Sequence, residues 1–260
     1  MVEAEAADPD PVPGAEDPGF PAYHASRSGG LAELDLRVSG CRACPRLVAW
    51  REEVAEGKRA AFRDWEYWGR PVPGFGPPDA TVAVVGLAPA AHDRTGRMFT
   101  GDATGDFLFV ALHALGLASQ PTSVDAGDGL TLRGVRLTSP VHCAPPANRP
   151  TPAERDTCRP WLAAELELLS PGLRAVVVLG GFGWQALLPV LADAGWRLPR
   201  PRPAFAHGAH VVLPATERRQ ELHLLGSYHP SQRNTFTGRL TMPMLTEVLR
   251  EAAGIGGLGT

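Results

Sequence analysis

Lysine, tyrosine and cysteine are scarce in this chain of 260 residues. Lys58 is the only lysine, and the chain contains three tyrosines and four cysteines. No apolar run approaches the roughly 18 residues that a membrane-spanning helix requires. Residues 1–20 are acidic and rich in proline, and they lack the basic stretch and apolar core of a secretory signal. We therefore expect a cytoplasmic protein that does not enter a membrane.

Several widespread catalytic motifs are missing as well. The glycine-containing loops match neither a phosphate-binding P-loop nor a dinucleotide-binding fingerprint. The chain has no G-x-S-x-G sequence, which argues against an α/β-hydrolase, and the turn GGFGWQAL at 180–187 contains no nucleophile. The chemistry must therefore be sought in other loops.

Negative charge is concentrated at the N-terminus. Residues 1–35 hold eight acids and one arginine, a net charge of −7, whereas the remaining residues hold 24 bases and 20 acids, a net charge of +4. A mildly basic body is compatible with nucleic-acid binding, although an ordinary solvated surface has the same pattern. We expect residues 1–30, which cannot bury a core, to form a disordered acidic tail, and residues 31–260 to form the folded domain.

Short apolar runs alternate with helical patterns through the rest of the chain. This alternation predicts an α/β fold with a largely parallel central sheet and helices on both faces. Ligands bind such sheets beyond the carboxyl ends of the strands, so the loops after strands are the place to look for a site. The patterns predict strands at 81–89, 134–143, 174–181, 210–215 and 221–230, and helices at 104–117, 151–169, 182–195 and 241–254. Thr151, Pro152 and Glu154 form a capping box at the start of the second helix.

The four cysteines suggest a metal site. Cys41 and Cys44 form a C-x2-C pair, and Cys143 and Cys158 lie far along the chain. Four thiolates suit a tetrahedral zinc ion or an iron–sulfur cluster, whereas a redox-active C-x2-C pair would leave two cysteines without a role. Inert buried thiols are a further alternative. The spacing does not separate zinc from iron, although the proline after Cys44 favours a [4Fe–4S] cluster.

Polar residues gather in three loops that follow predicted strands. The first loop offers Phe99 and Asp102, but Asp102 could simply cap the next helix and Phe99 could be an ordinary core aromatic. Asn148 lies in a proline-rich turn after the second strand, between two of the cysteines. His229 follows the last strand, where a single histidine is more often structural than catalytic.

Five segments in the same order resemble a known family. They are CRACPRLVAWREEV, YWGRPVPGFG, GLAPAAH with RTGRMFTGDATG, HCAPPANRPTP, and SYHPSQRNTFTGRLT. Together they resemble the family 5 uracil-DNA glycosylases, the iron–sulfur, broad-specificity type B, over residues 40–250. The resemblance implies a three-layer α/β/α sandwich that carries a [4Fe–4S] cluster. The cluster's ligands would be Cys41, Cys44, Cys143 and Cys158.

The resemblance also implies an activity. The enzymes of this family excise uracil, and other deaminated bases such as hypoxanthine, from DNA. We expect a bacterial, nucleoid-associated monomer that acts on double-stranded DNA. We also expect no strand cleavage, because the matched motifs offer no nucleophilic amine.

The roles of individual residues follow from the matched motifs. Asp102 matches the acidic residue, Phe99 the aromatic that stacks on the base, Asn148 the pocket asparagine, and His229 the histidine of the last motif. Backbone N–H groups of the loop that holds Gly86 and Ala88 would stabilise the departing base, and Arg233 and Arg239 would grip phosphates. Thr235, Phe236 and Thr237 would belong to an element inserted at the flipped nucleotide.

One loop departs from the family pattern. Between GLAPAAH and RTGR only Asp93 is present, about two residues fewer than expected, so the pocket rim is shorter and Asp93 becomes a rival to Asp102 for positioning water. The alternatives to a working enzyme are an iron–sulfur nucleic-acid-binding protein without catalysis, a redox protein, and a family member that binds uracil but turns it over poorly.

Overall fold

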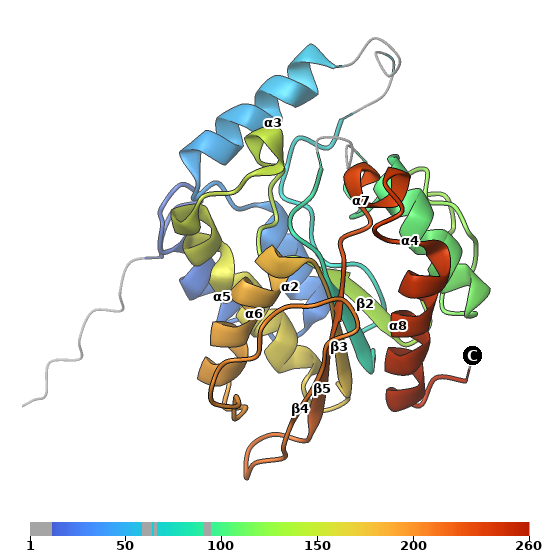
Figure 1. Cartoon of the computed structure of the whole chain (residues 1–260). Helices are drawn as coiled ribbons and strands as arrows, with labels where there is room; N and C mark the ends of the chain where they lie inside the picture. Colours follow the sequence, from blue (N-terminus) through green and yellow to red (C-terminus); the bar gives the residue numbers. More distant parts are fainter. Residues whose placement is uncertain (1–11, 59–63, 65–66, 91–94, 260) are drawn as a thin grey trace, which may run out of the picture.

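Five short strands form one sheet. A computed structural model of the chain describes residues 12–58, 64, 67–90 and 95–259 (Figure 1). The strand order is β2-β1-β3-β5-β4. The strands β1 (Val82–Val85), β2 (Val135–Thr138), β3 (Ala175–Leu179) and β5 (Leu222–Ser227) pair in parallel, and β4 (His210–Leu213) runs antiparallel to β5 at one edge. The predicted α/β fold with a largely parallel sheet is confirmed.

Helices cover both faces of the sheet and complete the three-layer sandwich (Figure 1). Alternate residues of β1 face opposite layers: Val82 and Val84 pack toward one core, and Ala83 and Val85 toward the other. The first core is closed by α4 (Ala103–Ala114) and α8 (Met242–Ile255). The second is closed by α1 (Phe20–Ala25), α2 (Leu31–Ser39), α5 (Pro152–Leu169) and α6 (Gly181–Asp193). None of the helices in the described ranges has the length and apolarity needed to cross a membrane.

The predicted capping box at the start of α5 is confirmed. The Thr151 side chain accepts a hydrogen bond from the Glu154 backbone, and the Glu154 carboxylate accepts one from the Thr151 backbone at 2.7 Å. The predicted strands exist but are shorter than expected. β2 ends at Thr138, before Pro140, and β5 ends at Ser227, before Pro230, since proline cannot donate a ladder hydrogen bond.

The expected disordered tail over residues 1–30 is wrong for residues 20–25. These residues form α1, which packs on α5 with the Phe20 ring 6.1 Å from the Trp161 ring and Ala25 buried. Residues 1–30 are acidic and rich in proline on average, so their composition did not indicate the apolar contact that Phe20 and Ala25 make. Residues 1–11 lie outside the described residues, and the predicted boundary of the domain at residue 31 stays a prediction. We did not predict α2, α3 (Pro45–Gly57) or α7 (Gln232–Phe236) from the sequence.

A buried ion network joins β2 to two helices. Arg136, whose side chain is 3% exposed, donates to Glu165 at 2.5 Å and to Asp35 at 2.6 Å. Thr138 donates to the second oxygen of the Glu165 carboxylate. Burial raises the pKa of Asp35 to about 6, against the opposing charge of Arg136. The single positive charge of the guanidinium is therefore shared between a buried carboxylate, Glu165, and a partly exposed one, Asp35.

We expect Arg136→Met to destabilise the protein by about 3–5 kcal/mol, because it leaves Glu165 buried without its partner. The measurement is the free energy of unfolding in urea. Arg250→Met is the matched control: it breaks an exposed ion pair with Glu247 and should cost less than about 1 kcal/mol. Equal losses in the two variants would contradict a stabilising role for the buried network.

Candidate active site

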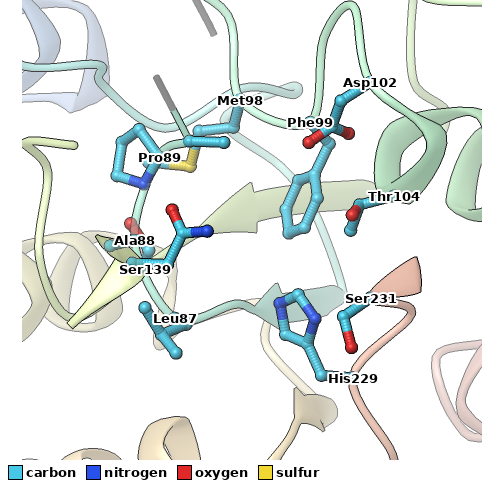
Figure 2. A pocket seen from close by; sticks show the side chains of 12 residues that line it. Leu87, Ala88, Pro89, Met98, Phe99, Asp102, Thr104, Ser139, His229 and Ser231 are labelled. Atoms are coloured by element: carbon cyan, nitrogen blue, oxygen red, sulfur yellow. The ribbon is translucent and has the colours of Figure 1, made fainter. Parts of the chain in front are cut away.

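A cavity of about 280 Å³ opens at the carboxyl edge of the parallel strands. Its walls come from residues 87–90 after β1, from the loop that leads into α4, and from the loops after β2 and β5. Figure 2 shows Phe99, Asp102 and His229 around this cavity, with Pro89 and Met98 across from them. The volume is at the lower end for ligand pockets and fits one small planar molecule. The cavity brings together Asp102, Phe99, Asn148 and His229, as the resemblance predicted.

Asp102 is the N-cap of α4. Its Oδ1 accepts a hydrogen bond from the Gly105 backbone N–H at 2.9 Å, so the structural interpretation of this residue is confirmed. Capping uses one oxygen, and no hydrogen bond from the described residues engages the other. Asp102 can therefore cap the helix and still present a free oxygen to the cavity.

Phe99 is held in an unusual backbone conformation. Its φ of 56° lies in the left-handed region, which a bulky residue adopts only when its surroundings impose it. A Cβ at Gly86 would come within 2.8 Å of the Phe99 ring, and a Cβ at Gly105 within 1.8 Å of the Phe99 carbonyl oxygen. Both glycines are needed because the ring lies against the end of β1 and its backbone lies against α4.

Asn148 projects from a tight turn after β2. The turn contains the single 3-10 turn η2 (Pro146–Asn148), in which Ala147 and Asn148 have φ values of 53° and 54°. Asparagine tolerates this left-handed region better than most residues. Arg46, on α3, donates to both oxygens of Glu154 at 2.7 Å and to the carbonyl of Arg149 at 3.1 Å, which anchors the turn.

His229 is kept neutral by burial. Burial lowers the pKa of His229 to about 4, against the charge of Asp102, so the imidazole is neutral at pH 7 and keeps a single N–H. Asn234 donates to the His229 carbonyl at 2.8 Å and fixes the loop. Gly180, with a φ of 94°, allows the close approach, since a Cβ there would lie 3.3 Å from the Cβ of His229. A neutral imidazole can donate one hydrogen bond to a ligand.

The predicted donor role of Gly86 is wrong. Its N–H already donates to the Thr138 carbonyl at 2.8 Å, in continuation of the parallel ladder, and the residue does not line the cavity. Leu87 and Ala88 do line it, and their N–H groups engage no hydrogen bond within the described residues. Leu87 and Ser139, which also line the cavity, were not predicted from the sequence. Both lie just after a strand, β1 and β2, and this position could have identified them.

The remaining predicted residues lie outside the cavity or outside the described chain. Arg233 and Arg239 are exposed beside it, on and after α7, and the Arg239 guanidinium lies 4.5 Å from the centre of the Tyr228 ring. Phe236, on the same helix, is 79% exposed, the highest value among the large hydrophobic side chains of the described residues. Asp93 lies outside the described residues.

A second, smaller cavity is lined by all four cysteines: Cys41, Cys44, Cys143 and Cys158. They come from the start of α3, the loop after β2 and the middle of α5. Burial, together with the neighbouring thiols Cys143 and Cys41, raises the pKa of Cys44 to about 12, and burial raises that of Cys143 to about 11. In the described residues no group of three or more His, Cys, Asp or Glu side chains is arranged to hold a single metal ion, so the four thiols line one space without forming a compact site for one ion.

The donors around this cavity suit an anionic, sulfur-rich group. Arg51 is 6% exposed and donates to the Cys143 sulfur at 2.9 Å. Arg51 Nε is buried without a hydrogen-bond partner in the described chain, and Trp161 Nε1, which faces the Cys41 thiol, is buried without a full hydrogen bond there. Buried N–H groups left without partners are costly, so they indicate a missing acceptor. Four thiols and two buried donors around one space fit a cluster better than a single ion.

The chain matches characterised families over most of its length. Residues 73–253 match the Uracil DNA glycosylase superfamily. The type-5 uracil-DNA glycosylase of Mycobacterium tuberculosis is 55% identical over 90% of this chain and 85% of that protein. The type-5 enzyme of Thermus thermophilus is 52% identical over 85% of this chain and 96% of its own, and that of Pyrobaculum aerophilum is 49% identical over 85% and 91%. The chain therefore belongs to the uracil-DNA glycosylase superfamily and, within it, to the type-5 uracil-DNA glycosylases.

Proposed function

We propose that this protein hydrolyses the N-glycosidic bond of uracil in DNA and thereby initiates base excision repair. The observation that carries the proposal is one base-sized cavity that unites a carboxylate, an aromatic ring, an amide and a neutral imidazole at the carboxyl edge of the sheet. The protein acts as a monomer on double-stranded DNA, and it releases the base without cutting the strand. Lys58, its only lysine, follows α3, away from the cavity.

The target nucleotide must leave the duplex to reach the cavity. Flipping costs a few kcal/mol, and less where the base is mispaired, as in a G·U pair. Stacking on Phe99 offsets part of this cost, because base–aromatic stacking is worth about 1–3 kcal/mol per base. The exposed Phe236 would fill the space that the base leaves, and the exposed Arg233 and Arg239 would bind the flanking phosphates.

Asn148 recognises the flipped base. Its amide offers two donor hydrogens and one acceptor, which can pair with the edge of uracil. A fixed amide rejects a base of the wrong pattern because buried polar groups are then left unpaired. An amide that presents both kinds of group also suits the related edge of hypoxanthine, so we include other deaminated bases among the substrates.

Bond cleavage separates charge between the base and the sugar. The N–H groups of Leu87 and Ala88 and the neutral His229 lie where they can donate to the departing base anion, as an oxyanion hole does. The free oxygen of Asp102 positions or deprotonates the attacking water, and its negative charge favours the positive sugar. Each residue therefore acts on a charge that develops only as the bond breaks.

Cys41, Cys44, Cys143 and Cys158 would hold a [4Fe–4S] cluster, with Arg51 and Trp161 donating to its sulfur atoms. Such a cluster supplies a rigid cross-link between segments far apart in the chain. Glycosidic hydrolysis is not a redox reaction, so the cluster would serve to position these segments rather than to transfer electrons. It would tie the start of α3 to the loop that carries Asn148.

Asp102→Asn should lower base release from a duplex with one G·U pair by roughly 10²–10⁴-fold, the range for a lost general base. Asparagine caps helices as well as aspartate does, so the melting temperature should stay unchanged. Release is measured by alkali cleavage and gel electrophoresis. Asp106→Asn, in the exposed first turn of α4, is the control and should keep full activity. Undiminished release by Asp102→Asn would move the role to another residue, and no release by the wild type would favour a binding protein.

His229 should titrate with a midpoint near pH 4, as followed by NMR of 15N-labelled histidine and assigned with His229→Gln. The ordinary value is about 6.5, so the unfolded chain takes up the proton first and the stability due to this residue falls as the pH drops from about 6.5 to about 4. Because the charge of Asp102 raises this pKa, Asp102→Asn should lower the midpoint further. A midpoint near 6.5 would contradict the lowered pKa, since about a quarter of the imidazoles would then be charged at pH 7.

Protein purified without oxygen should contain about four iron and four sulfide ions per chain. Cys158→Ser should lose most of the iron and melt at a lower temperature, because Cys158 is buried among the ligands. Thr157→Ala changes the neighbouring residue without removing a thiol and should keep the full iron content. Zinc without sulfide in the wild type would establish the other interpretation of the four cysteines.

A further inference from the structure

The loop at 119–131, between α4 and β2, contributes no residue to the cavity, yet it is the partner of the segment that carries Phe99. Its two ends are held together: the Ser119 N–H donates to the Thr131 carbonyl at 3.0 Å, and the Arg133 N–H to the Leu117 carbonyl at 2.9 Å. The loop is therefore closed at its base and can act as one unit.

Asp128 organises the inside of this loop. Its carboxylate accepts hydrogen bonds from the backbone N–H groups of Val124 at 2.8 Å and Leu130 at 2.9 Å. Burial works against the ionised form, but Arg97 and these N–H groups together hold the pKa of Asp128 well below its usual range. The carboxylate is therefore ionised wherever the protein is folded and functional.

Arg97 connects Asp128 to the loop that carries Phe99 and leads into α4. Its side chain is 3% exposed and forms a two-pronged pair with Asp128, with distances of 2.9 Å and 2.6 Å. The same guanidinium donates to the Ser123 hydroxyl at 2.8 Å and 3.1 Å. A planar guanidinium bound to a carboxylate in this way fixes orientation as well as distance.

The other side of Phe99 is bound to the same loop. The hydroxyl groups of Thr100 and Ser123 lie 2.8 Å apart, and the Gly101 N–H donates to the Ser123 carbonyl at 3.2 Å. Arg97 and Thr100 thus anchor the chain two residues before and one residue after Phe99. Between the anchors the backbone of Phe99 is held in the left-handed region, with a φ of 56°.

We propose that Asp128, acting through Arg97, is a positioning residue that holds the Phe99 ring in place for stacking on the flipped base. The proposal rests on the stacking role given to Phe99 above. Without the anchor, the Phe99 backbone can relax to a negative φ, which turns the ring away from the base. Asp102 is held separately, by its cap on α4, so the effect falls on the ring.

A double-mutant cycle tests the proposal. Single-turnover release of uracil from a G·U duplex is measured at saturating enzyme for the wild type, Asp128→Asn, Phe99→Ala and the double variant. Asp128→Asn should lower the rate by roughly 10²-fold, the cost of a misplaced reacting geometry. If Asp128 acts through Phe99, it should lower the rate by less than about threefold once the ring is gone, because coupled residues are not additive. Effects that multiply in the double variant would overturn the proposal.

Asp125→Asn is the matched control in the same loop. Asp125 is only partly buried, and its carboxylate accepts from the Gly127 N–H at 2.7 Å; no hydrogen bond to Arg97 is found in the described chain. Its rate should equal that of the wild type. The inhibition constant of free uracil gives a readout that a loss of folded protein would not change. It should rise in Asp128→Asn and stay constant in Asp125→Asn, and equal constants in both would overturn the proposal.

If Asp128→Asn fails to fold, Ser123→Ala enters the same cycle, because it removes the hydroxyl that meets both Arg97 and Thr100. The expected loss is roughly 3–10-fold for each hydrogen bond removed, again absent in the Phe99→Ala background. A wild type that releases no uracil would overturn the proposed function itself. An active wild type with indistinguishable Asp128→Asn and Asp125→Asn variants would overturn only the role of Asp128.

Discussion

Parallel pairing of β2, β1, β3 and β5 is the constraint on which the site depends. Parallel strands end at the same edge, so residues that are separated by more than a hundred positions, such as Phe99 and His229, meet around one cavity. Each strand ends there and a loop begins, because glycine or proline follows closely. The sheet therefore fixes where the loops begin, and the side chains that line the cavity come from the loops.

Local stability and chemistry are combined in single residues of these loops. Asp102 closes the first turn of α4 with one oxygen and faces the cavity with the other. Phe99 and Asn148 both occupy the left-handed backbone region, whose strain is characteristic of functional sites. The surrounding network, from Arg97 to the capping box of α5, holds these conformations, so the polar interior is as important to the site as the apolar core.

The fold class, the succession of strands and helices along the chain apart from α1, α2, α3 and α7, the capping box and part of the cavity lining could be predicted from the sequence, because each depends on local pattern or on a matched motif. Other features depend on distant partners. The helix α1 forms because Phe20 meets Trp161, far along the chain, and the N–H of Gly86 is occupied because β2 continues beside it. The partners of Arg97 in the loop at 119–131 could not be predicted either, because they lie far from Arg97 in the sequence.

Arg46 couples the position of α3 to the loop that carries Asn148. It follows Cys44 closely on α3, and its guanidinium holds both the Glu154 carboxylate and the Arg149 carbonyl. A shift of α3 would open the cap of α5 and free the turn of Asn148, while Asp102 would stay fixed to α4 on the other face of the sheet. A displacement of α3 would thus disturb the Asn148 side of the cavity while leaving the Asp102 side in place.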